Sequence, residues 1–267
     1  MAGAKPNKIA AKLKQLWSGG NPAKPSKLAW AAFGLAAASA VAALAVGLAH
    51  RFEWMAYQPG FLVLRITVWS AAAGGLLGIV ALIRAGTGAR RRGWAPGLLA
   101  LIVGLAYVAV PAYWALVVLP KVPRIHDIST DTDNPPAFAA IAPLRAKYVN
   151  PAAYDGPEVA ALQKQAYPDL VPLQIAKPPA AVFAAALETV QLLGLDLVNG
   201  SEKDGLIEAS SRTTFFGFVD DVAIRVRAAG SGTRVDVRSK SREGRSDFGV
   251  NAARVRKLVG AIQTKAG

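Results

Sequence analysis

The sequence lacks cysteine, and its first half has almost no acidic charge. With no cysteine among 267 residues, disulfide bonds and thiolate metal sites are both excluded. Residues 1–123 contain 13 Lys and Arg against one acid, Glu53, whereas residues 124–267 contain 18 bases and 16 acids. The basic excess therefore flanks apolar segments instead of gathering on a phosphate-binding domain, and nucleic acid is not a predicted partner.

Three long apolar runs are present in the first half. Residues 28–48 and 97–119 contain no charge, and residues 61–83 contain only Arg65. A helix rises about 1.5 Å per residue, so each run is long enough to cross a bilayer core of roughly 30 Å. We predict three transmembrane spans over these residues, the third kinked by Pro111.

The basic residues predict the direction of insertion. The loop after the first span offers only Arg51, and the exit from the third offers only Lys121 and Arg124 before acids appear. Ten bases lie in the two other flanks: Lys5, Lys8, Lys12, Lys14, Lys24, Lys27, Arg84, Arg90, Arg91 and Arg92. Because bases stay on the cytoplasmic side, we expect the N-terminus inside and the C-terminal half outside.

These observations predict three regions. Residues 1–27 form a basic cytoplasmic tail, residues 28–120 a transmembrane region, and residues 121–267 an extracytoplasmic domain. The Ala-rich composition and the lack of organelle signals indicate a bacterium, hence the inner membrane and a periplasmic or extracellular domain. A cleaved signal is the alternative for the first span, but its apolar run exceeds the usual 7 to 15 residues.

The three spans are better explained as a membrane anchor than as a transporter. Carriers usually place charged residues or broken helices at mid-depth, whereas Arg65 lies near the start of its span. Gly74 and Gly78 form a GxxxG step that permits close helix approach. This step fits either packing within the chain or a homodimer through the transmembrane helices.

The second half predicts an α+β domain. Prolines keep residues 124–179 mostly extended, with one short helix from Pro157 to Ala166. Further helices are expected after Pro178 and Pro179, closed by Gly194, and from Asp247 as N-cap to Thr264, with Phe248, Val255, Val259 and Ile262 buried. Strands are expected at residues 195–198, 206–212, 218–227 and 233–240.

The last two strands predict a hairpin whose register satisfies both faces of the sheet. A symmetric AGSG turn pairs Val226 with Val235, Ile224 with Val237, Arg225 with Asp236, Asp221 with Lys240, and Arg227 with Arg234. The last pair is repulsive unless an anion or a carboxylate lies between the two arginines. We therefore predict a two-layer domain, with two helices on an antiparallel sheet of about four strands and a charged sheet face left exposed.

The strongest candidate site is a cluster of arginines and aspartates around the second strand of the hairpin. Arginine forks suit both carboxylate side chains and anionic ligands, so pairing within the fold and ligand contact stay open as alternatives. The candidate ligand-binding residues are Asp220, Asp221, Arg225, Arg238, Arg242, Arg245 and Asp247. No catalytic residue is assigned, because basic neighbours lower carboxylate pKa values instead of raising them toward neutrality.

A calcium site is the weaker alternative in HDISTDTDN. Asp127, Asp131, Asp133 and Asn134 offer hard oxygen ligands, but the glycine and terminal glutamate of a calcium loop are missing. The same residues are typical of side-chain-capped turns. Neither a metal nor a cofactor is predicted.

Several ordered motifs carry a resemblance to a known family. DISTDTDNPPAF at 127–138, AYPD at 166–169, GFVDDVAIRVR at 217–227 and VDVRSKSREGRSDFGVNAARVR at 235–256 resemble the bacterial domain-of-unknown-function family numbered 1499. The resemblance implies an envelope or membrane-linked domain with no settled activity. It does not extend to the three spans.

The sequence thus favours a membrane-anchored envelope protein whose domain binds a partner or an anionic ligand, or has a structural role. The expected partners are the lipid bilayer, an envelope protein or anionic ligand, and a second copy of the chain. The alternative is a periplasmic hydrolase that uses aspartates of the cluster. A hydrolase should show a deep pocket with a carboxylate away from any arginine, whereas a binding or structural module should show its acids in salt bridges.

Overall fold

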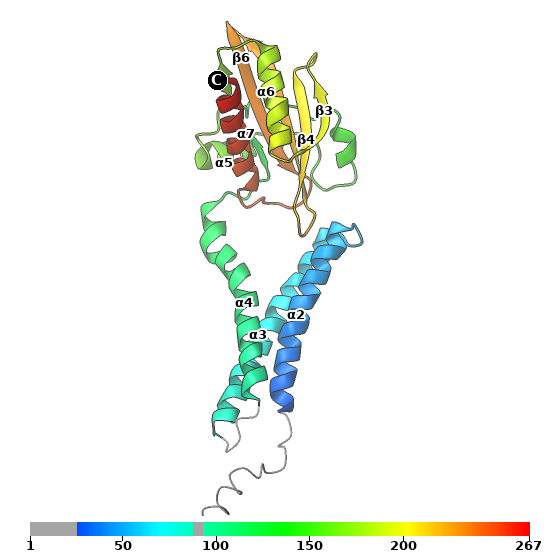
Figure 1. Ribbon diagram of the computed structural model, residues 1–267, viewed down its shortest axis with the longest axis vertical. Helices are drawn as coiled ribbons and strands as arrows, with labels where there is room; N and C mark the ends of the chain where they lie inside the picture. The colour runs from blue at the N-terminus through cyan, green and yellow to red at the C-terminus, as the bar shows by residue number, and fades with distance from the viewer. Residues whose placement is uncertain (1–25, 88–92) are drawn as a thin grey trace, which may run out of the picture. The chain divides into compact units, whose positions relative to one another are not determined.

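The computed structural model describes residues 26–87 and 93–267 (Figure 1). The chain forms two compact units. Among the described residues, those up to Ala45 and those within Phe61–Pro111 form the helical unit, and Val46–Gly60 together with Ala112–Gly267 form the C-terminal unit. Most of the ten bases that predict the direction of insertion, including Lys5–Lys24 and Arg90–Arg92, lie outside the described residues.

Three helices are long and apolar enough to cross a membrane, as the apolar runs predicted. They are α2 (Lys27–Arg51), α3 (Tyr57–Thr87) and α4 (Trp94–Tyr113), which continues as the π-helical turn η1 (Trp114–Val118) and the 3₁₀ turn η2 (Leu119–Lys121). Pro111 lies inside α4, and the winding changes three residues later. A proline that removes a backbone donor is a common cause of such a change.

Small residues bring the helices of the helical unit close together. A Cβ atom on Gly74 would lie 3.0 Å from the Ala32 carbonyl oxygen of α2, and one on Gly78 would lie 2.7 Å from the Gly97 carbonyl oxygen of α4. The GxxxG step of α3 therefore serves packing within the chain. A homodimer through the transmembrane helices stays a prediction and needs another helix face.

The C-terminal unit is α+β, as predicted, but its antiparallel sheet has six strands instead of four. The strand order is β1-β6-β5-β4-β3, and β2 also pairs with β6. The elements are β1 (Asp127–Ser129), η3 (Ala142–Arg145), α5 (Pro157–Ala166), β2 (Leu173–Ile175), α6 (Pro179–Leu192), β3 (Asp196–Ser201), β4 (Leu206–Arg212), β5 (Val219–Ala229), β6 (Gly232–Ser241) and α7 (Val250–Ala266). The two unpredicted strands have three residues each, too few for an alternating pattern.

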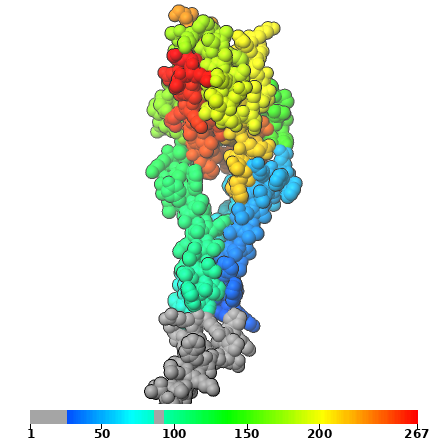
Figure 2. Space-filling view, in the orientation of Figure 1, coloured from blue at the N-terminus to red at the C-terminus, as the bar shows by residue number. Residues whose placement is uncertain are grey.

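Two helices cover one face of the sheet. α6 and α7 lie side by side over it, in yellow-green and red (Figures 1 and 2). Their apolar stripes bury Val182 and Val190 of α6 and, as the spacing predicted, Val255 and Ile262 of α7. Phe248 is a correction: it precedes α7, and 42% of it is exposed, so it is not part of the buried stripe.

The predicted hairpin register is confirmed at all five pairs. Alternation places Ile224 toward the helices and Asp221 and Arg225 on the opposite face. The prediction that this charged face is exposed is wrong, because Asp221 is fully buried and Arg238 is 2% exposed. Residues 130–156 cover it with Phe138, Ile141 and many polar contacts. Both faces of the central strands are therefore largely buried, and the charged face is open only at one end, where Arg227 has a 40% exposed side chain.

Candidate functional site

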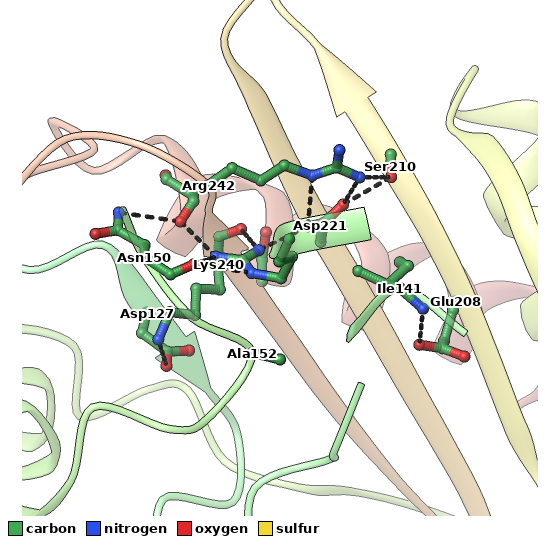
Figure 3. Close-up of polar contacts among 12 residues, drawn as sticks. Asp127, Ile141, Asn150, Ala152, Glu208, Ser210, Asp221, Lys240 and Arg242 are labelled. Atoms are coloured by element: carbon green, nitrogen blue, oxygen red, sulfur yellow. Dashed lines mark hydrogen bonds and ion pairs between the residues drawn. The ribbon is translucent and has the colours of Figure 1, made fainter. Parts of the chain in front are cut away.

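Asp221 is the most heavily bound carboxylate of the predicted cluster (Figure 3). Its Oδ2 accepts hydrogen bonds from Arg145 Nη1 at 2.6 Å and Arg242 Nε at 2.9 Å. Its Oδ1 accepts hydrogen bonds from Ser210 Oγ at 2.7 Å and Arg242 Nη2 at 2.8 Å. Since both oxygens are saturated inside the fold, Asp221 has no free lone pair for a substrate.

Arg145, which the sequence analysis did not single out, joins the covering segment to β5 and β6. η3 places it against the sheet, where its guanidinium also donates to the carbonyl oxygens of Asn150, Lys240 and Ser241. Burial lowers the pKa of this guanidinium from its usual value, and Asp221 opposes the change. These contacts occupy the donors of Arg145 within the fold.

A second buried group surrounds Asp127 at the end of β1. Arg238 Nε and Nη2 bind its two carboxylate oxygens in a fork at 2.8 Å each, and Lys240 Nζ lies 3.2 Å from Oδ2. The Arg238 guanidinium lies over the Phe138 ring, 4.7 Å from its centroid. This arrangement uses Arg238 for pairing within the fold, the structural alternative of the sequence analysis.

Asp155 extends this group toward the surface. Its Oδ1 lies 2.5 Å from Lys240 Nζ, and its Oδ2 lies 3.0 Å from His126 Nε2. Burial alone would raise the pKa of Asp155, but the hydrogen bonds from His126 and Lys240 outweigh it and lower the pKa to about 2. Asp155 is therefore ionised at neutral pH and unsuited to donate a proton there.

Three arginines converge on two aspartates at the other end of the charged face; we call these residues the cationic rim. Arg225 binds Asp236 at 2.9 and 3.1 Å, and Arg234 binds Asp236 at 2.8 Å and Asp131 at 2.6 Å. Arg227 Nη2 lies 3.3 Å from Asp236 and 3.5 Å from Asp131. Carboxylates thus separate Arg227 from Arg234, as the repulsive register pair required.

The remaining predicted residues lie elsewhere. Asp220 lies on the helix-covered face and pairs with Arg254 at 2.8 Å. Asp247 accepts hydrogen bonds from the backbone N–H groups of Gly249 at 2.8 Å and Asn251 at 2.9 Å, although burial raises its pKa. The prediction that Asp247 is the N-cap of α7 is wrong: Gly249 is the N-cap, and Asp247 binds N–H groups at the start of the helix from two residues before it. Arg245 is exposed and forms no ion pair with a described residue.

The carboxylates of the calcium alternative are used by the fold. Asp127 and Asp131 bind arginines, and Asp133 pairs with Lys164 at 2.9 Å. Asp131 Oδ1 also accepts the Asn134 N–H at 2.9 Å, which is the capped turn of the simpler interpretation. Within residues 26–87 and 93–267, no three His, Asp or Glu side chains are grouped as a metal ion requires.

A family model described as "Protein of unknown function (DUF1499)" matches residues 127–262, just over half of the chain. The chain belongs to this family. The DUF1499 match runs from the first residue of β1 into α7, so it includes every residue of the predicted cluster. The three apolar helices lie outside it. A search of the curated proteins found no match for the chain.

Glu208 is a further buried residue of the DUF1499 domain that the sequence analysis missed. Its carboxylate accepts the backbone N–H groups of Ala139 and Ala140 at 2.8 Å. It also accepts the N–H group of Ile141 at 3.1 Å (Figure 3). The available signal was its position along the strand. Glu208 pairs with Ala223, which lies two residues from Asp221, so the Glu208 side chain lies on the same face of the sheet as Asp221. An acid at a sheet position that faces no solvent requires such partners.

Two hollows adjoin the charged face of the DUF1499 domain. Their cavity volumes are about 360 and 510 Å³. Both are lined by Thr132, Asp133 and Lys164, and Arg234 of the cationic rim lines the first. Asp133, the exposed carboxylate there, has an 85% exposed side chain and is paired with Lys164. The hollows therefore offer paired acids and bases together with threonine hydroxyls beside the rim.

Proposed function

We propose that this chain is a membrane-anchored envelope protein whose DUF1499 domain is a non-catalytic binding module for an anionic group. The three apolar helices support the anchor. The bases around them support a cytoplasmic N-terminus, and hence a periplasmic or extracellular domain, in a bacterial inner membrane.

The observation that carries the binding role is the excess charge of the cationic rim. Three guanidinium groups face two carboxylates, Asp131 and Asp236. Arg227 has a 40% exposed side chain and forms no hydrogen bond with a described residue, only the longer contacts at 3.3 and 3.5 Å. A guanidinium has five donors, so Arg227 can take up a carboxylate or phosphate from solvent.

The hydrolase alternative has less support. Asp220 and Asp221 are bound by arginines and so offer no free carboxylate. Asp247 has no arginine partner among the described residues, but its carboxylate binds two backbone N–H groups at the start of α7. Asp221 and Asp127 are also fully buried, where substrate does not reach them. These acids match the salt-bridged arrangement expected of a binding or structural module.

The binding role is tested by anion-dependent stabilisation of the full chain in detergent. We expect inorganic phosphate and citrate to raise the melting temperature above that in chloride of equal ionic strength, and Arg227→Gln to abolish the rise. Arg212→Gln, which removes one exposed positive charge from β4, outside the cationic rim, should retain the rise in melting temperature. Equal responses in both variants, or stabilisation by divalent metals alone, would contradict the proposal.

The membrane orientation is tested separately by protease added to intact spheroplasts. We expect the C-terminal domain to be digested before lysis, because positive residues hold the opposite ends of the helices inside. Protection of the domain until the cells are lysed would reverse the orientation. A reporter fused at the C-terminus gives an independent readout.

A further inference from the structure

Two loops of the C-terminal unit expose phenylalanine side chains; we call them the aromatic loops. Residues 213–218, TTFFGF, join β4 to β5, and residues 245–249, RSDFG, lead into α7. Phe215 is 39% exposed and Phe248 is 42% exposed. Leu192 at 70% and Val171 at 58% are more exposed, so what distinguishes Phe215 and Phe248 is that both are aromatic rings in loops.

Phe248 is unfavourable in two ways as long as only the domain is considered. Its φ is +55°, in the left-handed region that bulky residues avoid at a cost of the order of 1–3 kcal/mol. Its ring also remains 42% exposed, although it contacts Trp114 at a centroid distance of 5.6 Å. A contact outside the domain that buries the ring would account for this exposure.

Other contacts within the C-terminal unit locate the aromatic loops at the ends of the apolar helices. This unit includes Val46–Gly60 and Ala112–Lys121, the last turns of α2 and the turns that follow α4. The His50 ring Nδ1 lies 2.6 Å from the Phe216 carbonyl oxygen, and Arg51 Nη1 donates to the Thr213 carbonyl oxygen at 3.1 Å. The aromatic loops are thus close to the level at which apolar helices leave a bilayer.

The surroundings of the loops have the composition of a membrane interface. Lys121, Arg124 and Arg245 are exposed and form no ion pair with a described residue. Phe52 and Trp54, in the connection between α2 and α3, stack at 5.3 Å, and Trp54 is 78% exposed. Unpaired cations beside aromatic rings are typical of the headgroup layer, where phosphates pair with the cations and rings lie at the apolar boundary.

We infer that the aromatic loops insert Phe215 and Phe248 into the phospholipid headgroup layer on the outer side, so that the DUF1499 domain is docked on the bilayer surface. Lys121, Arg124 and Arg245 then bind lipid phosphates. This contact is separate from the cationic rim and does not depend on the proposed anion-binding role. Its energetic basis is the burial of two rings together with charge pairing.

The absence of native cysteine allows a direct test with single-cysteine variants of the full chain. Phe215→Cys and Phe248→Cys are labelled with an environment-sensitive fluorophore in nanodiscs of phosphatidylcholine and phosphatidylglycerol. Ser231→Cys, in the turn at the opposite end of β5, is the position control. Val171→Cys, an exposed apolar residue outside the aromatic loops, is the side-chain control.

We expect lipids that carry a quencher in the headgroup region to quench the labels at positions 215 and 248 several-fold more than those at 231 and 171. Equal quenching at all four positions would overturn the inference, even with the chain still inserted in the nanodisc. Melting curves verify that each variant folds. If Phe248→Cys melts early, the label at position 215 decides the outcome alone. The anion response of Arg227 remains a separate measurement, so the two proposals can fail independently.

Discussion

The two faces of the sheet are buried by different physical means. The face toward α6 and α7 is apolar, whereas the opposite face carries acids, arginines and a lysine beneath a largely irregular segment. Ile224 and Asp221 lie on the same strand, and both are fully buried. Burial therefore says little by itself about which interaction holds a face together.

The comparison shows what each face contributes. Apolar burial is non-directional and stabilises in proportion to the area removed from water. Buried ion pairs recover little beyond the cost of desolvation, but removal of one partner leaves an uncompensated charge. The charged face thus determines where residues 130–156 dock, and the apolar face supplies most of the net stability.

The comparison is tested most severely at Asp221. Asp221→Ala leaves Arg145 and Arg242 buried without their shared carboxylate, and we expect a loss of about 3–5 kcal/mol in the free energy of unfolding. Denaturant titration of the full chain in detergent measures it. Asp133→Asn, which removes an exposed partner of Lys164, should cost at most about 0.5 kcal/mol. Similar losses in both variants would show that burial does not set the cost.

The apolar face is tested at Ile224. We expect Ile224→Ala to lower the free energy of unfolding by about 2–4 kcal/mol, because it removes buried methylene and methyl groups and leaves a cavity against the helices. Because no charge is removed, its effect should not change with moderate salt concentration. A marked salt dependence of the Ile224→Ala effect would contradict the assignment of the two faces.

Asp155 makes the charged face sensitive to acid. Its pKa is lowered from 3.8 to about 2 in the folded state, so ionised Asp155 stabilises the fold at neutral pH. That contribution, about 2 kcal/mol, is complete above roughly pH 5 and is lost as the pH falls toward 2. Asp155→Asn should reduce the stability difference between pH 5 and pH 2 by this amount.

The control for Asp155 is Glu158→Gln, which removes an exposed carboxylate three residues away. We expect it to leave the difference in the free energy of unfolding between pH 5 and pH 2 nearly unchanged. An equal effect of both substitutions would show that net charge, and not the contacts with His126 and Lys240, governs the acid response.

The smallest expected effect belongs to Asp247, which precedes α7. Asp247→Ala removes the acceptor of two backbone N–H groups and should cost about 1 kcal/mol. Because burial raises the pKa of Asp247, protonation is favoured in the folded state, and this group's contribution to stability rises as the pH falls. The loss should therefore be smaller for Asp247→Asn, and circular dichroism melting curves of both variants measure the difference.

Local patterns predicted much of the fold. Pro157 and Glu158 marked the start of α5, which runs over the predicted residues. The register of β5 and β6 was predictable because one turn satisfied both the apolar and the charged pairs. The chain order of one helix, four longer strands and a second helix was also predictable, because apolar residues alternate along the strands and recur at helical spacing in the helices.

The covering of the charged face could not be predicted from local patterns. Arg145 and Asp221 are 76 residues apart, and nothing near either residue identifies the other as its partner. The seven candidate residues were chosen by proximity in sequence, whereas the fold distributes them among separate contacts. Arg225 retains a place on the proposed rim, and Arg227, named only as a repulsive pair, became its most accessible member.

The Glu208 carboxylate gives the covering segment an unusual dynamic property. Three successive amides, those of Ala139, Ala140 and Ile141, share it as their acceptor. Rotation of one side chain would release all three protons to deuterium exchange in a single event, with the ladder between β4 and β5 intact. We therefore expect these three amides to exchange together, at a rate set by the Glu208 side chain and not by the melting of a strand.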